Sequence, residues 1–275
     1  MKNKVKTFKL FVRPDEKSQQ IAEQIRELNK NKSTPFIESD PADLVIAIGG
    51  DGTFIQAVTE THFSKDIIYT GIHTGTLGFL QDLCENDIYS LIQYLEFEKE
   101  LKTRKVYIAQ IKVFFKDNST KQFFALNDAF IQGDNASKIS FAEYINGEHL
   151  QNVVCSGILI ATNTGDTAFS ANLGSAIDFS NNFQLVCQLF APIKNSTTER
   201  IIENPIICSQ VLLSFKPSNN IRIIVDGKKK DIDSDSISSI KVSMLDDSNF
   251  INKLDLMNFS KVRIVREKIL GYKEF

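Results

Sequence analysis

Apolar residues in the first hundred positions follow two alternating patterns. Short continuous apolar runs, which predict buried strands, are followed by segments whose apolar residues recur every three or four positions, which predict helices. The predicted strands are 8–13, 44–48 and 67–72, and helices are expected from Ser18, after residue 53 and from Ile88. Strands that alternate with helices in this way are typical of a parallel sheet with helices on its faces. We therefore predict an α/β, Rossmann-like domain with a parallel sheet over residues 1–98.

Later in the chain, apolar and polar residues alternate one by one, which is typical of half-buried strands. Asn146-Gly147 and Asp226-Gly227 are dipeptides that favour tight turns between antiparallel strands. Residues 99–254 are therefore predicted to form a mainly β domain, either a sandwich or a set of packed sheets. The remaining segment, 255–275, contains one more strand-like run at 262–265 and is compatible with a return to either domain.

Composition narrows the class of protein. The chain of 275 residues is 42% hydrophobic and 24% charged, as expected of a globular protein, and its net charge of −2 does not favour nucleic-acid binding. No run approaches the ~20 apolar residues of a membrane helix, and residues 8–13 are too short and too charged for a signal-peptide core. The four cysteines form no paired motif, which favours a reducing, cytoplasmic location. The three histidines lack metal-ligand spacing.

Gly49-Gly50-Asp51-Gly52-Thr53 follows a predicted strand directly and carries most of the functional information in the chain. Glycines at a strand end allow backbone N–H groups to approach a ligand, and a helix start beside them favours anionic oxygen such as phosphate. A carboxylate inside such a site suggests two roles for Asp51. It can hold a divalent cation that neutralises phosphates, or it can accept a proton from an attacking hydroxyl. Both roles indicate phosphoryl transfer, whereas the alternative is a chance surface turn.

Four further segments stand out after this turn: Gly71–Leu80, Leu126–Asp128, Thr162–Ser170 and Ala191–Ile193. Together with Gly49–Thr53 they resemble, in sequence and order, the motifs of the NAD kinase family. They are similar to its signature turn, its second glycine turn, its Leu-Asn-Glu and its Thr-Pro-Thr-Gly-Ser-Thr-Ala-Tyr-Ser segment. Ala191–Ile193 is similar to a stretch that reaches a neighbouring subunit's nucleotide in family oligomers. The resemblance covers most of the chain.

The resemblance implies an α/β domain joined to a β-rich domain, with the nucleotide site between them. It implies transfer of the γ-phosphoryl group of ATP to the 2′-hydroxyl of the adenosine ribose of NAD, giving NADP, with Mg²⁺ or another divalent cation. Asp51 is the candidate general base, because a ribose hydroxyl is a poor nucleophile until its proton is accepted. The resemblance also implies a homo-oligomer, a dimer or tetramer, while the composition predicts a cytoplasmic protein with no nucleic-acid or membrane partner.

The resemblance assigns residues to each ligand. Contacts with ATP phosphates are expected from Gly49, Gly50, Gly52, Thr53 and Gly75. Contacts with NAD are expected from Asp51, Gly52, Phe79, Asn127, Asp128, Ser156, Thr167, Ala168, Phe169, Asn172 and Ala191. Asn127 and Asp128 suit nucleoside recognition independently, because a carboxylate accepts from hydroxyls or an exocyclic amine and an amide both donates and accepts. No protein side chain is assigned as a metal ligand.

Five positions depart from the family pattern. Asp128 is one methylene shorter than the usual Glu, Ser156 replaces a charged Asp, and Phe169 lacks the hydroxyl of Tyr. Asn163 replaces a proline and leaves its loop less constrained, and Asp166 replaces a small hydroxyl residue near a phosphate site. These departures bear on substrate affinity and nicotinamide-side specificity more than on the reaction, since Asp51 and its turn are intact.

Two alternative functions remain open from the sequence. Lipid kinases of the diacylglycerol and sphingosine type share a similar Gly-Gly-Asp-Gly-Thr turn, but they usually follow it with Asn-Glu, where this chain has Phe54-Ile55. No basic amphipathic face for a lipid surface stands out. The other alternative is an NAD-binding sensor without turnover, which Ser156 and Asp166 suggest and the intact Asp51 opposes.

Overall fold

The computed structural model describes residues 5–75, 78–98, 100–180, 183–194, 201–215, 220–244 and 249–271, so Thr76 and Leu77 of the second glycine motif lie outside it. Residues 1–106 together with 250–275 form one compact unit, and residues 107–249 form another. The first unit thus extends past the expected boundary at residue 98, because β5 (Thr103–Tyr107) and β17 (Phe250–Leu254) join its sheet.

The first unit contains a six-stranded sheet in the order β2-β1-β3-β4-β17-β5. Its other strands are β1 (Thr7–Val12), β2 (Ile37–Glu38), β3 (Leu44–Gly49) and β4 (Ile68–His73). The pairs β1–β2, β1–β3, β3–β4 and β4–β17 are parallel, so the predicted parallel sheet is confirmed. Every residue of β3 is buried, as expected for a central strand covered on both faces.

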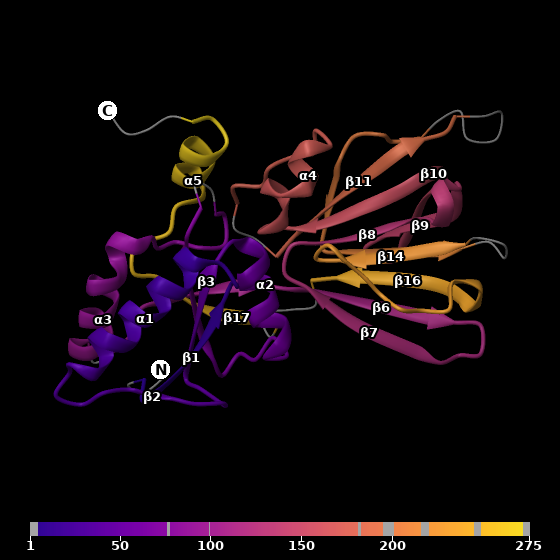
Figure 1. Cartoon of the computed structure of the whole chain (residues 1–275). Coiled ribbons are helices and arrows are strands. Elements are labelled where there is room, and N and C mark those ends of the chain that lie inside the picture. The colour runs from indigo at the N-terminus through magenta and orange to yellow at the C-terminus, as the bar shows by residue number, and fades with distance from the viewer. Residues whose placement is uncertain are drawn as a thin grey trace. The chain divides into compact units, whose positions relative to one another are not determined.

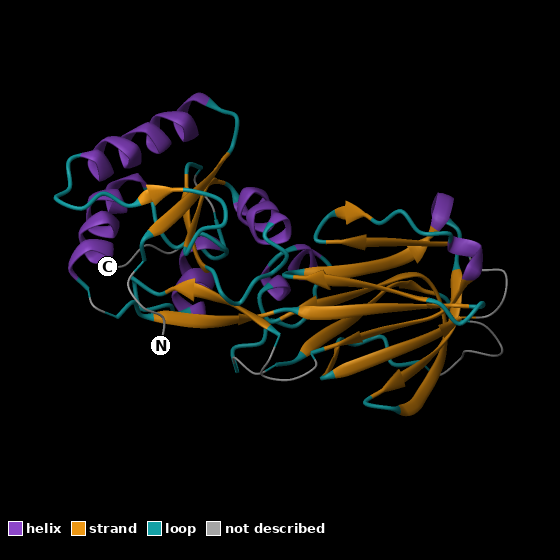
Figure 2. Ribbon diagram, turned by 90° about the horizontal axis from the view of Figure 1, so that it is seen from below, coloured by secondary structure: helices purple, strands orange, loops and turns teal. Residues whose placement is uncertain are grey.

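Helices cover both faces of this sheet (Figures 1 and 2). They are α1 (Glu16–Lys30), α2 (Asp51–Glu60) and α3 (Ile88–Phe97), and a further helix, α5 (Lys261–Lys268), follows β17 in the chain. The apolar sides of α1 and α3 share one buried cluster with Ile46 of β3. On the other side, Phe54 of α2 packs edge-on against Tyr69 of β4, with ring centroids 6.4 Å apart. Strands β3 and β4, whose carboxyl ends lead into the two glycine turns, are therefore packed against helices on both faces.

The start of α1 differs from the prediction. Asp15, not Ser18, is the N-cap, and its carboxylate accepts the Ser18 N–H at 3.1 Å. Ser18 is fully buried inside the helix, where its hydroxyl donates to Asp15 at 2.7 Å. Both residue types favour N-caps, so the pattern did not separate them.

The strand predicted at 262–265 is wrong, because these residues belong to α5. Ser260 caps the helix and its hydroxyl accepts the Arg263 N–H at 3.3 Å. Val262 is 63% exposed while Val265 is buried, as expected for a helix that buries one of its faces. Short apolar runs do not distinguish a strand from a helix, and here the cap decides.

The second unit is built from short strands. They are β6 (Ala109–Phe115), β7 (Thr120–Ala125), β8 (Asp128–Gly133), β9 (Ile139–Ile145), β10 (Glu148–Thr162), β11 (Leu185–Pro192), β12 (Ile206–Cys208), β13 (Gln210–Phe215), β14 (Ile221–Val225), β15 (Lys228–Lys229) and β16 (Ile237–Ser243). Each pair among them with a described register is antiparallel. The predicted mainly β domain is confirmed. The one α-helix described in this unit, α4 (Phe169–Asn172), is a single turn.

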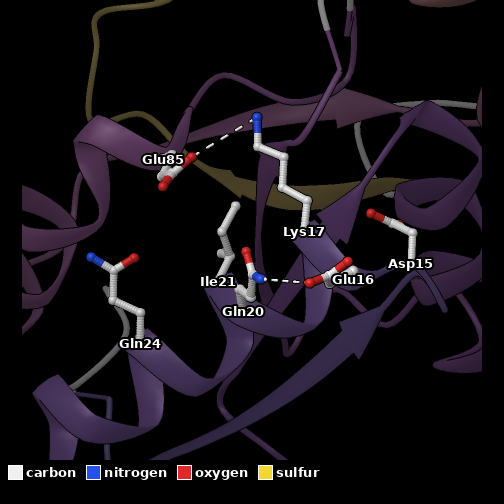
Figure 3. A pocket seen from close by; sticks show the side chains of 7 residues that line it. All are labelled: Asp15, Glu16, Lys17, Gln20, Ile21, Gln24 and Glu85. Carbon is white, nitrogen blue, oxygen red and sulfur yellow. Dashed lines mark hydrogen bonds and ion pairs between the residues drawn. The ribbon is translucent and has the colours of Figure 1, made fainter.

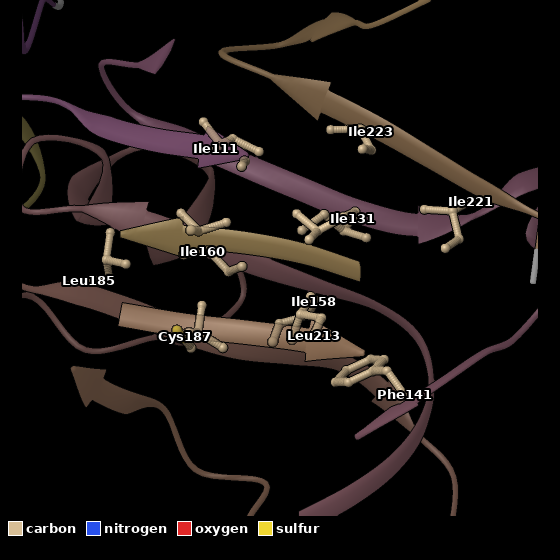
Figure 4. Packing of buried hydrophobic residues seen from close by; sticks show 14 of the residues in the cluster. Ile111, Ile131, Phe141, Ile158, Ile160, Leu185, Cys187, Leu213, Ile221 and Ile223 are labelled. Atoms are coloured by element: carbon tan, nitrogen blue, oxygen red, sulfur yellow. The ribbon is translucent and has the colours of Figure 1, made fainter. Parts of the chain in front are cut away.

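The long strand β10 organises this unit. Cys155 pairs with β9 on one side and with β11 on the other, whereas Gly157 pairs with β8 and β11. Strands β9 and β8 therefore follow each other along one edge of β10, so β10 joins two groups of strands. Ile158 and Ile160 of β10 pack in the cluster of buried side chains shown in Figure 4.

The two predicted hairpin turns are confirmed. Asn146-Gly147 connects β9 to β10, and Asp226-Gly227 connects β14 to β15. All four residues have φ between 49° and 94°, the left-handed region that two-residue hairpin turns require. The second of these turns has a further role in the candidate site.

Candidate active site

The first glycine turn joins the end of β3 to the start of α2. Gly49 has φ 151°, and a Cβ there would lie 2.5 Å from Thr53 Oγ1 and 2.8 Å from Arg13 Cβ. Only glycine fits this close approach. Gly50 is the N-cap and Asp51 is the first residue of α2, so the free N–H groups of the helix and its positive dipole end lie at this turn.

The Asp51 carboxylate ties the first glycine turn to the second. Its Oδ2 accepts the Phe79 N–H and its Oδ1 accepts the Leu80 N–H, both at 2.9 Å. Gln81 reinforces the link, because its Nε2 donates to the Gly50 carbonyl at 2.8 Å. Asp51 is half-buried, and the two bonds hold its carboxylate in orientation. Sequence patterns predicted the two turns but not the bonds between them.

Two cations that sequence reasoning missed lie beside these turns. Arg13, just after β1, donates from Nη2 to Thr74 Oγ1 at 3.0 Å, and its Nε pairs with Asp15 at 2.6 Å. Lys268, in the last turn of α5, lies over the Phe79 ring at 5.8 Å. Burial lowers the pKa of Lys268, while the nearby Asp51 carboxylate opposes that change. Lys268 thus adds positive charge near Asp51, while the charge of Arg13 is partly offset by its pairing with Asp15.

Asp226 organises the predicted nucleoside-binding residues of the second unit. Its Oδ2 accepts the Leu126 N–H at 2.8 Å, and its Oδ1 accepts those of Asn127 and Asp128 at 2.7 and 3.1 Å. The hairpin turn that carries Asp226 therefore fixes the backbone at the start of β8. The sequence signal here was only that of a turn, since the bonded residues lie about a hundred positions earlier.

The Thr162–Ser170 segment packs directly on Asn127. The Thr162 N–H donates to the Asn127 carbonyl at 2.8 Å, and the Thr162 hydroxyl donates to the Leu126 carbonyl at 2.7 Å. A Cβ on Gly165 would lie 2.0 Å from the Asn127 carbonyl oxygen, so only glycine allows this approach. The structure thus brings the two predicted motifs of this unit together.

The carboxyl group of Asp128 is a weaker acid than an exposed aspartate, because its pKa is raised. Burial, and then the neighbouring Asp226 carboxylate, raise the pKa of Asp128 to about 7. A buried carboxyl with a raised pKa binds a proton more readily in the folded than in the unfolded chain. At neutral pH it is therefore poised between a hydrogen-bond donor and an acceptor.

Replacing Asp128 with Asn is expected to stabilise the ligand-free protein above neutral pH. The parent binds more protons folded than unfolded between its ordinary pKa of 3.8 and about 7, so its stability falls across this range. Asn has no such penalty, and the gain is on the order of 4 kcal/mol at alkaline pH and absent in acid. Thermal denaturation at several pH values measures it. Asp231→Asn, an exposed carboxyl after β15, is the control, and equal pH dependence of the two variants would contradict the assignment.

Two positions that depart from the family pattern meet at Asp178. The carboxylate of Asp166 is fully buried, and its Oδ2 accepts the Asp178 N–H at 2.7 Å. Asn163 donates from Nδ2 to the carbonyl and the carboxylate of Asp178, at 2.9 and 3.1 Å. Asp166 and Asn163 therefore hold the loop after α4.

The other predicted ligand residues are placed as follows. In the first unit, Phe79 and Thr53 are half-buried, and Gly52 and Gly75 are exposed. In the second unit, Thr167 is buried, Ser156 and Ala168 are half-buried, and Asn172 and Ala191 are exposed. Phe169 is 44% exposed and packs edge-on against Phe130, with ring centroids 5.8 Å apart.

A cavity of about 590 Å³ lies along α1, and none of the predicted ligand residues lines it (Figure 3). It is lined by Asp15, Glu16, Lys17, Gln20, Ile21, Gln24 and Glu85. Three carboxylates and one ammonium group line it, and the ammonium of Lys17 points to Glu85 at 3.9 Å. This balance of charge does not suit a phosphate.

Within the described residues, no three His, Cys, Asp or Glu side chains gather as a metal site. No described helix is both long enough and apolar enough to cross a membrane.

Comparison with known proteins gives consistent matches. Residues 2–99 match the model described as ATP-NAD kinase N-terminal domain. NAD kinase 1 of Oceanobacillus iheyensis is 34% identical, over 62% of this chain and 64% of that protein. NAD kinase of Finegoldia magna is 28% identical, over 92% of this chain and 94% of that protein. NAD kinase of Bacteroides fragilis is 32% identical, over 74% of this chain and 69% of that protein.

Solved structures share the fold. A yeast NADH kinase complexed with NADH matches with a TM-score of 0.82 at 19% identity, covering 100% of this chain and 90% of that one. An NAD kinase from Archaeoglobus fulgidus in complex with ATP matches with a TM-score of 0.69 at 16% identity, covering 97% of this chain and 100% of that one.

Proposed function

We propose that this chain, which belongs to the NAD kinase family, transfers the γ-phosphoryl group of ATP to the adenosine 2′-hydroxyl of NAD with Asp51 as general base. The observation that supports this role is the geometry of Asp51. Its two oxygens are each fixed by one backbone N–H at 2.9 Å, at the start of a helix beside a glycine turn. A carboxylate so held keeps lone pairs available for one more donor.

The proposed step is an in-line displacement. The 2′-oxygen of the ribose forms a bond to the γ-phosphorus, the bond from that phosphorus to the bridging oxygen of ADP breaks, and the hydroxyl proton passes to Asp51. General-base assistance of this kind contributes roughly 10²–10⁴-fold in rate. Positioning of the reactants and stabilisation of charge supply the remaining rate acceleration, as in other phosphoryl transfers.

The phosphates of ATP are assigned to the first glycine turn. The N–H groups of Gly50 and Gly52 lie at the start of α2, which has 10 residues and presents its positive dipole end there. The Thr53 N–H already donates to the Gly50 carbonyl at 2.9 Å, so the contact of Thr53 with phosphate is assigned to its hydroxyl. Arg13 adds a guanidinium beside Gly50, since a Cβ on that glycine would lie 3.6 Å from Arg13 Nη1. Gly75 is assigned to the same phosphates.

A divalent cation, Mg²⁺ or a similar ion, fits the site as a companion of the nucleotide. Such ions are often bound mainly by substrate phosphates, and Asp51, the carboxylate of this turn, is assigned to the proton and not to the ion. The described residues contain no larger cluster of ligands, so ATP would carry most of the coordination. When bound, the ion neutralises charge on the phosphoryl oxygens.

Contacts with NAD are proposed for the residues that the resemblance assigned. Asn127 and Asp128 are expected to bind the nucleoside through hydrogen bonds, with Asp226 holding their backbone in place. The remaining assigned contacts are Gly52, Phe79, Ser156, Thr167, Ala168, Phe169, Asn172 and Ala191. Phe169 offers an exposed ring face to a base.

A cytoplasmic homo-oligomer, dimer or tetramer, completes the proposal. All four cysteines are free, which fits a reducing compartment. Among the described strands, β12 pairs with β11 alone, so its outer edge is available to another copy. Its exposed Ile207 adds apolar surface at this edge.

The function is tested by incubating the protein with NAD and Mg-ATP and reading NADP through an NADP-specific dehydrogenase. NADP formation is the expected result. Diacylglycerol and sphingosine are the control acceptors, and phosphorylation of either without NADP would favour the lipid-kinase alternative. A rise in Tm with NAD but no product would favour a sensor.

A further inference from the structure

Three charged side chains are buried together behind the second glycine turn. Lys253 of β17 is 1% exposed, and its Nζ lies 2.8 Å from Asp82 Oδ2. Arg104 of β5 lies 3.4 Å from the same oxygen through Nη2. The side chains of Asp82 and Arg104 are only 14% and 20% exposed. One carboxylate thus joins two strands that sequence reasoning did not connect to the site.

Burying these charges is a costly way to join two strands, although Lys253 and Arg104 hold the pKa of Asp82 below its ordinary value. Removing charges from water costs several kcal/mol per ion, and buried ion pairs often repay it only in part. Burial lowers the pKa of Lys253 to about 8 even though Asp82 opposes the change, which is the signature of that cost. Aromatic rings offset some of it, because Arg104 lies 3.6 Å from the Phe259 ring centroid and Lys253 lies 5.3 Å from that of Phe54. An apolar packing of these strands would avoid the cost.

The cluster is connected to Asp51 by consecutive residues. Phe79 and Leu80 donate the two N–H groups that hold the Asp51 carboxylate. Asp82 follows two positions after Leu80 and is anchored by Lys253. Only two peptide units separate the donor to Asp51 from the anchor, so both belong to one short segment of backbone.

The next residue anchors the segment to the sheet. The His73 N–H donates to the Leu83 carbonyl at 2.8 Å, and the Leu83 N–H donates to the Gly71 carbonyl at 3.2 Å. Residues 79–83 therefore lie between Asp51 at one end and β4 at the other, with the ion cluster between them. Without the cluster, the middle of this segment retains the bond from Gln81 to Gly50.

We propose that Asp82, Lys253 and Arg104 form a positioning cluster that sets the orientation of the Asp51 carboxylate through the N–H groups of Phe79 and Leu80. The cluster does not touch the substrate and acts through Asp51. This inference rests on the proposed function, because it assigns the cluster to the proton-transfer step. It predicts that loss of the cluster slows turnover while nucleotide binding is retained.

The test uses Lys253→Met, which keeps the length of the side chain and removes its charge. Misplacement of a catalytic group by about 1 Å costs on the order of 10²-fold, so kcat is expected to fall by about 10- to 100-fold. KM and Kd for NAD are expected to stay within about threefold of the parent. Asp82→Asn is the second variant, and the same fall in kcat with unchanged KM and Kd is expected. If Lys253→Met does not fold, Asp82→Asn tests the proposal alone.

Asn29→Ala is the matched control for a purely structural loss. Asn29 is 7% exposed and makes two hydrogen bonds of 2.9 Å with Phe36 in the same unit, away from residues 79–83. Its loss is expected to lower Tm with kcat unchanged. If the cluster variants behave like Asn29→Ala, losing Tm but not kcat, the proposal is overturned.

Amide hydrogen exchange separates this proposal from the proposed function. Faster exchange at Phe79 and Leu80 in the folded cluster variants, but not in Asn29→Ala, supports the positioning role whatever the reaction. Unchanged exchange at both amides overturns it. A parent that forms no NADP would contradict the proposed function, while the exchange result would still decide the role of the cluster.

Discussion

Asp51→Asn is expected to lower kcat by about 10²–10⁴-fold, the range that a general base supplies. The amide has nearly the same shape but does not take up the ribose proton. The Kd for NAD is expected to change by less than about threefold, because the lost interaction belongs to the transition state. Steady-state NADP formation and calorimetric NAD binding measure the two quantities on the same preparation.

The Asp51 variant also disturbs a backbone contact, and a control is needed for that. An amide nitrogen would face the N–H of Phe79 or Leu80, since each carboxylate oxygen accepts one of them at 2.9 Å. Gln81→Met removes the neighbouring bond to the Gly50 carbonyl but leaves the carboxylate, so it measures the cost of loosening the turns, and its kcat is expected to fall at least about tenfold less than that of Asp51→Asn. Equal losses in both variants would mean that Asp51 holds the turns and is not the base.

Gly165→Ala is expected to have the second large effect, on nucleotide binding and on stability. The added Cβ would lie 2.0 Å from the Asn127 carbonyl oxygen and 2.4 Å from its carbon, so backbone must move. Overpacking of this kind costs about 3 kcal/mol or more when no flexible side chain can yield. Displacing Asn127 is expected to weaken NAD binding at least about tenfold, as measured by calorimetry on the folded fraction.

Gly174→Ala provides the comparison in the same loop region. A Cβ there meets nothing within 4 Å, although the φ of 71° disfavours side chains. The expected loss is about 1 kcal/mol, with NAD affinity unchanged. Similar losses of affinity in the two variants would contradict the close contact between Gly165 and Asn127 as the cause.

The parts of the site that the sequence predicted are those determined by neighbouring residues. Gly49–Thr53 follows a fully buried strand and starts a helix, and both features are visible in the local pattern. The hairpin turns at 146–147 and 226–227 are local in the same sense, because their residue types suit the left-handed backbone. Such features need no knowledge of the rest of the chain.

The parts that the sequence did not predict depend on contacts between distant residues. Asp226 gave a turn signal, but its bonds reach residues 98 to 100 positions away. Lys253 occurs in a strand, where a lysine suggests an exposed edge, yet it is almost fully buried against Asp82. The run 262–265 was compatible with a strand, but it belongs to a helix capped by Ser260. The same helix carries Lys268, which lies over the Phe79 ring.

The central claim is that this chain phosphorylates NAD with Asp51 as the base. Single-turnover transfer from γ-labelled ATP to NAD, in the parent and in Asp51→Asn at saturating nucleotide, tests it most directly. The account predicts labelled 2′-phosphate on NAD in the parent and a transfer rate at least about 100-fold lower in the variant. Equal transfer rates in the two proteins would contradict the role of Asp51, and the absence of label on NAD in the parent would contradict the reaction itself.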